Sequence, residues 1–518
     1  MTTTARIRGQ EAWRFASDVL AERSERGFAA RFAILVAAIL VVPWAISLLD
    51  LPGGAWRFLV PGSVALILAT AYLWWPVEAL LGFAMFVAFY DSIEVHIGNA
   101  KQADELAVAL LAPIAFLRAW RDWRVWTWWP REVSLSVFFL AAIASTVVAG
   151  VPWSIALPGL ILVSKALLFF YAVLWTRFPA WAISGALRVG LAVGLAVMAL
   201  GLIEFLNPPA FQSFFGLPEY VRSRGEGAVV KSLFAHPALF GFFATTVALF
   251  AYAQYQVTRR WRWLGVALFM SLGPFFSARR RAILALLIGL LAGFGESLRR
   301  VRDPRTVAKT WLPVLGGLVV VGFIFGSGLA NLYTATFERY LQRTPTVVEG
   351  ENGSGVIGSG ENAQARLALY TGSVLVARDH LPFGGGLGRY GTWTSRENYS
   401  PLYHRYDLDQ VPGLKERRPS AVTDTFWPAI LGETGVIGLF AYLAFIATLG
   451  IILWREAARD DGPLLLLLRY GAGMVFAQVL VESLASSMFH SPPRVYLAYL
   501  VVGAVAALAW RRRSPEPE

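Results

Sequence analysis

Long apolar runs separated by short polar segments dominate the chain from about residue 31 to residue 510. Each run holds roughly 20 residues, enough for a helix to cross a hydrocarbon core of about 30 Å. The pattern therefore predicts membrane-spanning helices. They fall near residues 32–49, 57–75, 77–92, 104–120, 133–151, 154–175, 182–205, 233–255, 262–276, 281–297, 311–330, 425–453, 463–486 and 493–510.

These runs predict an all-α polytopic membrane protein of about 12–14 transmembrane helices, since a helix satisfies its own backbone hydrogen bonds in lipid. One long polar insert, expected to be an external loop that contains helices, interrupts the runs. The predicted regions are a cytoplasmic amphipathic lead-in (1–30), a transmembrane domain (31–330), the insert (331–423), C-terminal transmembrane helices (424–511) and a cytoplasmic tail (512–518).

Composition agrees with this class of protein. Hydrophobic residues make up 56% of the chain and charged residues only 15%, whereas soluble domains carry about a quarter charged residues. The net charge of +12 fits the excess of Lys and Arg in cytoplasmic loops, so no nucleic-acid partner is implied. The chain has no cysteine, which excludes disulfides and thiolate metal sites.

The distribution of arginine predicts an orientation. With the N-terminus inside, the loops "RAWRDWRVWTWWPRE" and "ESLRRVRDPRTVAK" and the tail "WRRRSPEPE" face the cytoplasm, as the positive-inside rule requires. Residues 207–232, the insert and "SSMFHSPPR" then lie outside, at the outer face of a bacterial cytoplasmic (inner) membrane.

The motif "SARRRA" breaks this rule, because Arg279, Arg280 and Arg281 fall on the outer side at the start of a span. Guanidinium groups at a lipid headgroup interface can simply snorkel. They also bind phosphate bidentately, and the start of a helix adds unpaired amide groups. A lipid-linked phosphate or pyrophosphate is the ligand that we expect at this depth.

A second cationic group, Arg222, Arg224 and Lys231, lies on the same side just before a span. It is either part of the same anion site or a solvated loop. The following His236-Pro237 pair is more typical of a helix entry than of a catalytic base.

The insert divides into four stretches. "NLYTATFERYLQR" predicts a membrane-parallel helix, and "VEGENGSGVIGSGENAQ" a mobile loop. A helix of about four turns follows, with Arg366 on its first turn and its end near Pro382. The glycine run Gly384–Gly386 is either a helix cap or a close backbone approach to a ligand. The last stretch, rich in Tyr, Trp, Arg and Asp, is either a saccharide-binding loop or a solvated loop.

Three carboxylates mark the last spans. Asp424 precedes a span and is either an N-cap or a functional group. Glu433 and Glu482 lie within spans, where an ionisable residue usually lines a cavity or has a partner, so either one could pair with an outer arginine.

The order of these pieces resembles the O-antigen ligase and O-antigen polymerase superfamily, membrane glycosyltransferases that use lipid-linked sugars. The resemblance rests on the arginine-bearing loop before "FAHPALFGFF", on "SARRRA", on "QARLALYTGSVLVARDHLPFGGGLGRY" and on "DTFWPAILGETGVIGL". It covers residues 222–439.

The resemblance implies transfer of a glycan from undecaprenyl pyrophosphate to an acceptor hydroxyl of a saccharide, without nucleotide sugar, metal or other cofactor. The family's pyrophosphate-binding arginines correspond to Arg280, with Arg279 or Arg281 as alternates, and to Arg222 or Arg224, while Arg366 faces the same cavity. Lys231 belongs to this cationic group. Where ligases carry a His-Asn pair, this chain has Asp424 and Thr425. This difference favours a polymerase, or a ligase of another polysaccharide, over an O-antigen ligase. Asp424 or His404 is the expected base.

A transporter of lipid-linked oligosaccharide is the main alternative. Flippases and exporters commonly show internal pseudo-symmetry and expose cationic groups to both leaflets. The two halves of this chain show no such repeat, and the unexplained positive charge lies on one predicted side.

Overall fold

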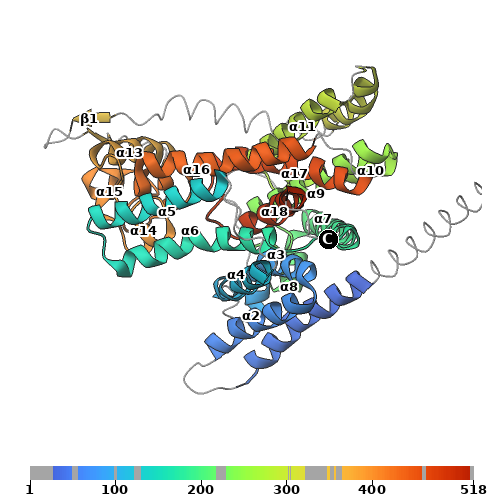
Figure 1. Cartoon of the computed structure of the whole chain (residues 1–518), viewed down its shortest axis with the longest axis horizontal. Helices are drawn as coiled ribbons and strands as arrows, with labels where there is room; N and C mark the ends of the chain where they lie inside the picture. Colours follow the sequence, from blue (N-terminus) through green and yellow to red (C-terminus); the bar gives the residue numbers. More distant parts are fainter. Residues whose placement is uncertain are drawn as a thin grey trace, which may run out of the picture.

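The computed structural model describes residues 27–49, 56–97, 102–121, 130–216, 229–300, 303, 305–320, 347–349, 355–357, 365–457 and 462–513. Nearly all of these residues are helical, as predicted (Figure 1). Before the insert, the helices are Gly27–Ser47, α2 (Trp56–Trp74), α3 (Pro76–Ile97), α4 (Ala103–Arg121), α5 (Pro130–Val148), α6 (Trp153–Leu174), α7 (Ala180–Leu206), α8 (Pro208–Phe215), α9 (Pro237–Thr258), α10 (Trp261–Phe276), α11 (Arg280–Arg300) and residues 305–320. The C-terminal helices are α16 (Trp427–Ala457), α17 (Pro463–Ser483) and α18 (Arg494–Arg513).

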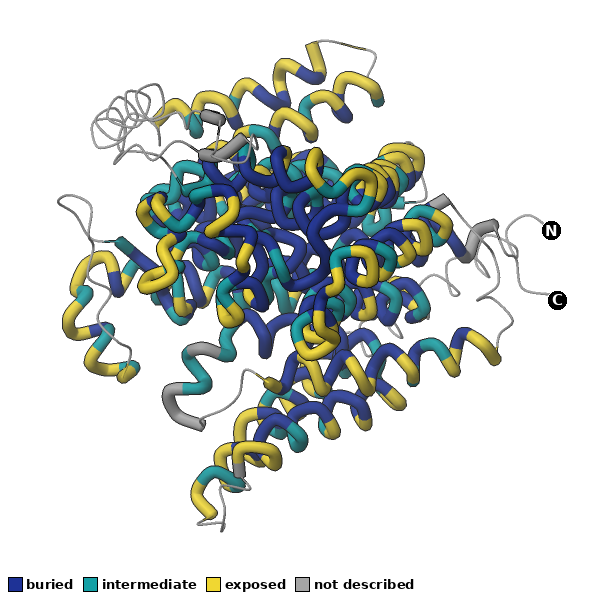
Figure 2. The backbone as a smooth tube through the Cα atoms, turned by 90° about the vertical axis from the view of Figure 1, so that its left-hand side faces the viewer, coloured by how far each residue is buried: buried dark blue, intermediate teal, exposed yellow. Residues whose placement is uncertain are grey.

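The helices form a polytopic membrane protein. Within the described residues, nine helices are long and apolar enough to cross a membrane, and two shorter apolar helices accompany them. Large apolar side chains lie exposed on their outer faces, for example Phe58 (75% exposed) and Leu140 (66%). Such surfaces suit lipid and not water. Figure 2 shows the buried residues along the middle of the bundle, with exposed faces around them.

Helix α9 lies at the centre of the bundle. Most of its residues are buried, and it packs against α10, α17 and α11. Its sequence is apolar all round, which is the pattern of a helix enclosed by other helices. Because α9 begins at one end of the bundle and α11 and α18 begin at the same end, the residues before these helices are brought together.

The described part of the insert folds on its own small core at one end of the bundle (left in Figure 1). It contains α13 (Ala365–Asp379), α14 (Trp393–Glu397), α15 (Pro401–Arg405) and the short 3₁₀ helix Leu408–Gln410. The four-turn helix expected after Arg366 is therefore confirmed. Aliphatic side chains make up most of this core, together with the buried Tyr390, Tyr403 and Tyr406.

One expectation for the insert is corrected. The Gly- and Ser-rich stretch contains a two-stranded antiparallel hairpin, β1 (Val347–Glu349) and β2 (Gly355–Ile357), where we expected a loop without structure. Val347 pairs with Ile357 and Val348 with Val356. The β-branched residues on both sides of the glycines favour this pairing. The membrane-parallel helix expected over residues 331–343 lies outside the described residues.

The glycine run approaches another backbone segment. Helix α16 is interrupted at Gly435, where φ is 66° and ψ is −164°. The Gly385 amide donates to the Gly432 carbonyl (2.8 Å), and the Gly386 amide donates to the Glu433 carbonyl (3.0 Å). A side chain at Gly384 would collide with the α16 backbone. These glycines therefore join the insert to the membrane domain.

Glu433 completes this junction. Its carboxylate is buried and accepts hydrogen bonds from the Tyr390 amide (3.0 Å) and the Thr392 hydroxyl (2.8 Å). The expected pairing of Glu433 with an outer arginine is therefore wrong. The carboxylate is instead satisfied by groups of the loop that α16 anchors.

Candidate functional site: a charged cluster at one end of the bundle

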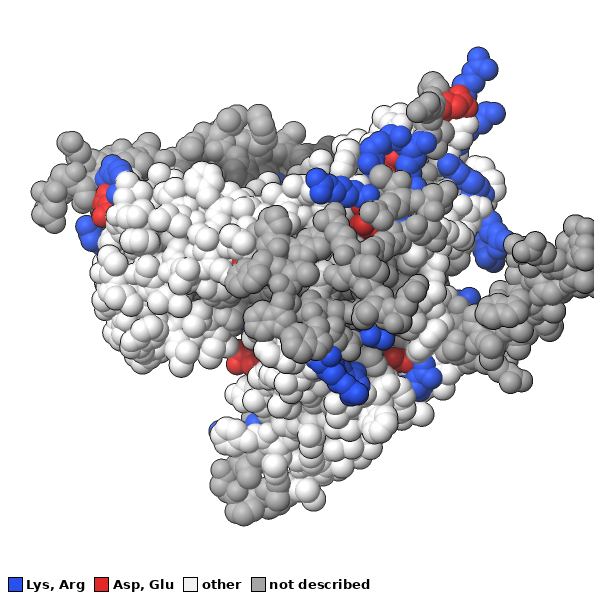
Figure 3. Space-filling view, in the orientation of Figure 1, with Lys and Arg blue, Asp and Glu red and all other residues white. Residues whose placement is uncertain are grey.

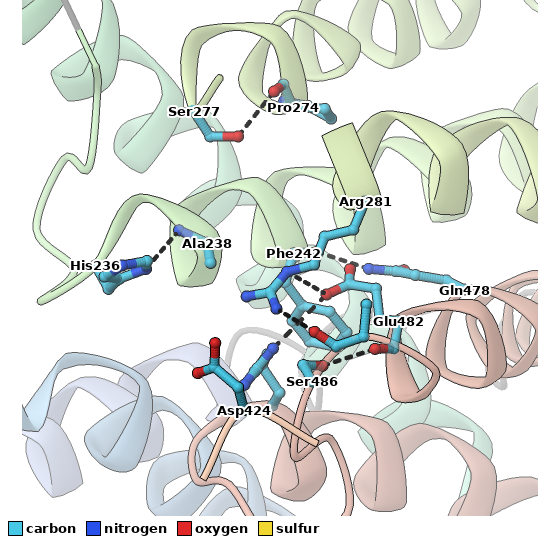
Figure 4. Close-up of polar contacts among 12 residues, drawn as sticks. His236, Ala238, Phe242, Pro274, Ser277, Arg281, Asp424, Gln478, Glu482 and Ser486 are labelled. Atoms are coloured by element: carbon cyan, nitrogen blue, oxygen red, sulfur yellow. Dashed lines mark hydrogen bonds and ion pairs between the residues drawn. The ribbon is translucent and has the colours of Figure 1, made fainter. Parts of the chain in front are cut away.

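Seven ionisable residues gather where the insert meets the membrane helices. We call them the charged cluster: His236, Arg279, Arg281, Arg366, Asp424, Glu482 and Arg494. Six helix ends supply them, namely the starts of α9, α11, α13, α16 and α18 and the end of α17. Figure 4 shows Arg281 and Glu482 turned toward each other, with Asp424 below them and His236 farther to the left, next to Ala238.

Glu482 lies between two arginines. Its Oε2 atom is 4.0 Å from Arg281 Nε and 3.8 Å from Arg494 Nη1. Arg281 also donates through Nη1 to the carbonyl of Ala485 (3.1 Å), which fixes the guanidinium against the end of α17. The predicted pairing of Glu482 with an arginine is confirmed.

These buried charges are paired but not hydrogen-bonded to each other. Both oxygens of Glu482, and Nε and Nη1 of Arg494, are buried and have no hydrogen-bond partner within the described structure. Buried polar groups are nearly always hydrogen-bonded, and leaving one unmade is costly. The ion pairs of 3.8–4.0 Å therefore leave buried donors of Arg494 that a polar group could engage.

Arg366 and Asp424 form a shorter pair beside them. Arg366 Nη2 and Nε donate to the same oxygen of Asp424, Oδ2, at 2.8 and 3.2 Å. The side chains are 38% and 40% exposed, so the pair faces the opening of the cluster. Within the described structure Asp424 accepts from Arg366 and not from the first turn of α16, so it is no N-cap. Tyr370 donates to the Leu484 carbonyl (2.8 Å) and holds α13 against the end of α17.

His236 combines a structural position with a polar contact. Its Nδ1 atom accepts from the Ala238 amide (3.1 Å), so it caps α9, as the helix-entry interpretation predicted. Its Nε2 atom lies 3.1 Å from Arg279 Nη2. Burial, together with the positive charges of Arg279, Arg281 and Arg494, lowers the pKa of His236 to about 4. The imidazole is therefore neutral at physiological pH.

Two of the remaining predicted residues, Lys231 and Arg280, fall within the described residues. Arg222 and Arg224 fall outside the described residues. Lys231 is buried, and burial lowers the pKa of its ammonium group, while its amide donates to Glu204 Oε2 (3.0 Å). Arg280 begins α11 and is partly buried.

His404 lies within the insert. Its Nδ1 atom is 2.9 Å from Asp409 Oδ2, and its Nε2 atom is 3.7 Å from Glu416 Oε2. These contacts tie His404 to neighbouring acids of the insert and not to the charged cluster.

Arg494 is the cluster member that our sequence reasoning missed. It follows "FHSPP" at the predicted outer end of the last span, so it violates the positive-inside rule in the same way as "SARRRA". A search for single arginines that violate the positive-inside rule, and not only for clusters of them, identifies Arg494. The neighbouring His490 is also buried, and burial lowers its pKa to about 3.

The arrangement defines an α-helical multi-pass membrane protein with a charged cluster at one end. Four guanidinium groups face two carboxylates and a neutral imidazole, which leaves an excess of positive charge. Compared with protein-family models and with curated protein sequences, the chain matches none.

Proposed function

We propose that the protein is a membrane glycosyltransferase that moves a glycan from an undecaprenyl-pyrophosphate donor to a hydroxyl of a saccharide or lipid-linked saccharide acceptor. Polymerisation and ligation share this chemistry. The observation that carries the proposal is the charged cluster, in which four arginines from the starts of three helices converge beside one partly exposed carboxylate.

The arginines suit a pyrophosphate. Departure of a lipid pyrophosphate concentrates negative charge on the leaving oxygen, and preorganised cations stabilise that charge in the transition state. Arg281 and Arg494 have a carboxylate only at 3.8–4.0 Å, and the buried Nε and Nη1 of Arg494 remain to bind phosphate oxygens. In this proposal Arg281 takes the central role that we expected of Arg280.

The contact between His236 and Arg279 supports an anionic ligand. A neutral imidazole accepts a hydrogen bond at one nitrogen only. Because Nδ1 accepts from the Ala238 amide, Nε2 carries the proton and faces the N–H of Arg279 at 3.1 Å. Two donors face each other, and an anionic oxygen beside them would accept from both.

Asp424 suits the role of the base. Its Oδ2 atom accepts from Arg366, which orients the carboxylate and leaves Oδ1 for the acceptor hydroxyl. In the proposed step, the hydroxyl oxygen bonds to the anomeric carbon as the bond from that carbon to pyrophosphate breaks. The hydroxyl proton passes to Asp424, and undecaprenyl pyrophosphate leaves. A single displacement inverts the anomeric carbon.

The proposal places the cluster and the insert at the outer face of a bacterial cytoplasmic membrane that the chain crosses about 12–14 times. The insert would then cover the acceptor side of the cluster. The core of the insert supports the exposed Trp393. The guanidinium carbon of Arg396 lies 3.8 Å from the centre of the Trp393 ring. Aromatic and guanidinium groups of this kind suit the faces and hydroxyls of sugars.

The experiment that tests the function is an incubation of the purified chain in nanodiscs with undecaprenyl-pyrophosphate-linked oligosaccharide, with products resolved on a gel. A ladder of longer lipid-linked glycans identifies a polymerase, and modification of an added acceptor such as lipid A core identifies a ligase. We expect Arg281→Gln to lower the rate by at least about 100-fold, because it removes one cation from the leaving group.

Two variants make this test specific. Asp424→Asn keeps the shape of the carboxylate but cannot take the proton, and we expect a similar loss. Arg280→Ala is the matched control, and we expect it to lose less activity than Arg281→Gln. An unchanged donor under all conditions, with glycan recovered in the opposite leaflet of vesicles, would replace the enzyme by the transporter.

A further inference from the structure

A second cavity lies inside the membrane bundle, away from the charged cluster. Its volume is about 690 Å³, within the ~300–1,000 Å³ typical of ligand pockets. Its walls are mostly apolar and come from α3, α7, α9, α10, α17 and α18, through residues such as Leu81, Leu187, Phe243, Leu467 and Val501.

The cavity extends toward the end of the bundle opposite the cluster. On α9, the cluster uses His236 before the first turn, whereas the cavity is lined from Phe243 to Thr258 at the last residue. These residues span about 22 Å along the helix axis. Helix α17 runs in the opposite direction to α9 and gives the same separation. Glu482 of the cluster lies at the end of α17, whereas Pro463 and Leu464 of the cavity lie at its start.

The charged side chains that line the cavity lie near that opposite end of α9. Arg188 and Arg262, both exposed, line it together with Gln254 and Trp263. The Gln254 Oε1 atom and the Trp263 indole N–H are buried and have no hydrogen-bond partner within the described structure. A polar ligand in the cavity could hydrogen-bond to this donor and this acceptor, which line it together with two guanidinium groups.

We propose that this cavity binds an anionic phospholipid of the leaflet opposite the charged cluster. The fatty-acid chains occupy the apolar part, and the phosphate lies between Arg188 and Arg262, within reach of the Trp263 N–H. Basic pockets between transmembrane helices bind anionic lipid headgroups in this way. The inference does not depend on the proposed transferase activity, since the headgroup lies at the other end of α9.

Gly190 offers a way to fill the cavity without damaging the fold. It lines the cavity in the middle of α7, and a side chain built on it meets no atom within 4 Å. Leucine at this position would occupy the space of the lipid chains. Gly265 on α10 is the matched control, because its added side chain also meets nothing within 4 Å, although Gly265 does not line the cavity.

The test uses the full chain reconstituted in phosphatidylcholine vesicles that contain a photoreactive diazirine phosphatidylglycerol. After illumination, labelled peptides are mapped by mass spectrometry. We expect labelling within α7 and α9, lowered at least about fivefold by Gly190→Leu and unchanged by Gly265→Leu, because burial of each CH₂ contributes to lipid affinity.

The headgroup is tested by charge. Arg188→Gln and Arg262→Gln should each lower labelling by phosphatidylglycerol but not by photoreactive phosphatidylcholine, whereas Arg260→Gln, an exposed neighbour outside the cavity, should change neither. Equal labelling of wild type and Gly190→Leu overturns the proposal. Displacement of the label by added undecaprenyl phosphate also overturns it, because the cavity would then hold an isoprenoid chain.

Discussion

At the scale of single residues, Glu482 is the carboxylate that balances the positive charge of the arginines in the cluster. The carboxylate is fully buried, accepts no hydrogen bond within the described structure and lies 3.8–4.0 Å from two guanidinium groups. A buried carboxylate in this position balances the arginines when no other anion is present. It therefore competes with an anionic ligand for the same positive charges. Its removal should lower the stability of the protein and, at the same time, strengthen the binding of an anion.

We expect Glu482→Gln to lower the free energy of unfolding by about 3 kcal/mol, because two buried guanidinium groups lose their counter-ion. Added inorganic pyrophosphate should raise the thermal unfolding midpoint of this variant more than that of the wild type. Thermal unfolding in detergent, with and without pyrophosphate, measures both effects. Glu433→Gln is the control, because it removes a buried carboxylate from the glycine junction and should leave the pyrophosphate effect unchanged.

The two buried histidines predict a pH dependence of stability. Burial lowers the pKa of His236 to about 4 and of His490 to about 3, whereas an unfolded histidine titrates near 6.5. Below about pH 6.5 the unfolded chain binds protons that the folded chain does not, so this contribution to stability is complete above pH 6.5 and falls as the pH drops toward 4.

Thermal unfolding between pH 7 and pH 4.5 should therefore show a falling midpoint. His236→Asn, which retains a side chain able to cap α9, and His490→Phe should each flatten this dependence. The same slope in both variants as in the wild type would assign the pH effect to other groups.

At the scale of elements, the interruption of α16 joins the membrane domain to the insert. Gly435 has backbone angles that only glycine adopts readily, and an added side chain would collide with the Pro382 carbonyl and the backbone after it. The glycine loop then donates its amides to the α16 carbonyls that the interruption exposes. The insert is thus held by backbone contacts that tolerate little change.

Gly435→Ala should destabilise the protein by more than about 2 kcal/mol, from backbone strain and from the collision. Gly473→Ala in α17 is the control, because its added methyl group meets no atom within 4 Å. Limited proteolysis should cut the insert of the Gly435 variant faster and leave the control as resistant as the wild type. Equal resistance of the two variants would show that the junction does not depend on this glycine.

At the scale of the whole molecule, charge divides along the long axis. In Figure 3 the face over α5, α6 and α16 carries almost no charge, whereas Lys and Arg gather toward the end with α10 and α11. An uncharged band between charged ends is the surface expected of a bundle that crosses lipid. The end with the insert also carries exposed basic side chains, among them Arg378, Arg405 and Arg417.

The absence of cysteine makes the orientation directly measurable. Ser420 lies exposed in the insert, and Thr306 lies exposed at the start of helix 305–320, which we expect in the cytoplasm. In intact spheroplasts, Ser420→Cys should react with a membrane-impermeant maleimide, and Thr306→Cys should react only after the membrane is opened. The reverse result would invert the predicted topology and contradict the proposed outer location of transfer.

Hydropathy in the sequence determined the helical membrane architecture, because apolar runs of spanning length have few alternatives in lipid. A described helix coincides with each predicted span, at least in part. The same local logic found Arg279, Arg281 and Glu482, since charges out of place in a membrane protein stand out along the chain. The number of crossings, the orientation and the family resemblance remain predictions.

Tertiary packing alone decided which of these charges meet. Glu433 and Glu482 are alike in sequence, but one binds loop amides and the other lies between two arginines, because their helices end beside different neighbours. Arg366 and Asp424 are 58 positions apart and meet only because the insert folds back on the bundle. The cavity in the bundle likewise arises from the packing of six helices that are far apart in the sequence, so no local sequence pattern predicts it.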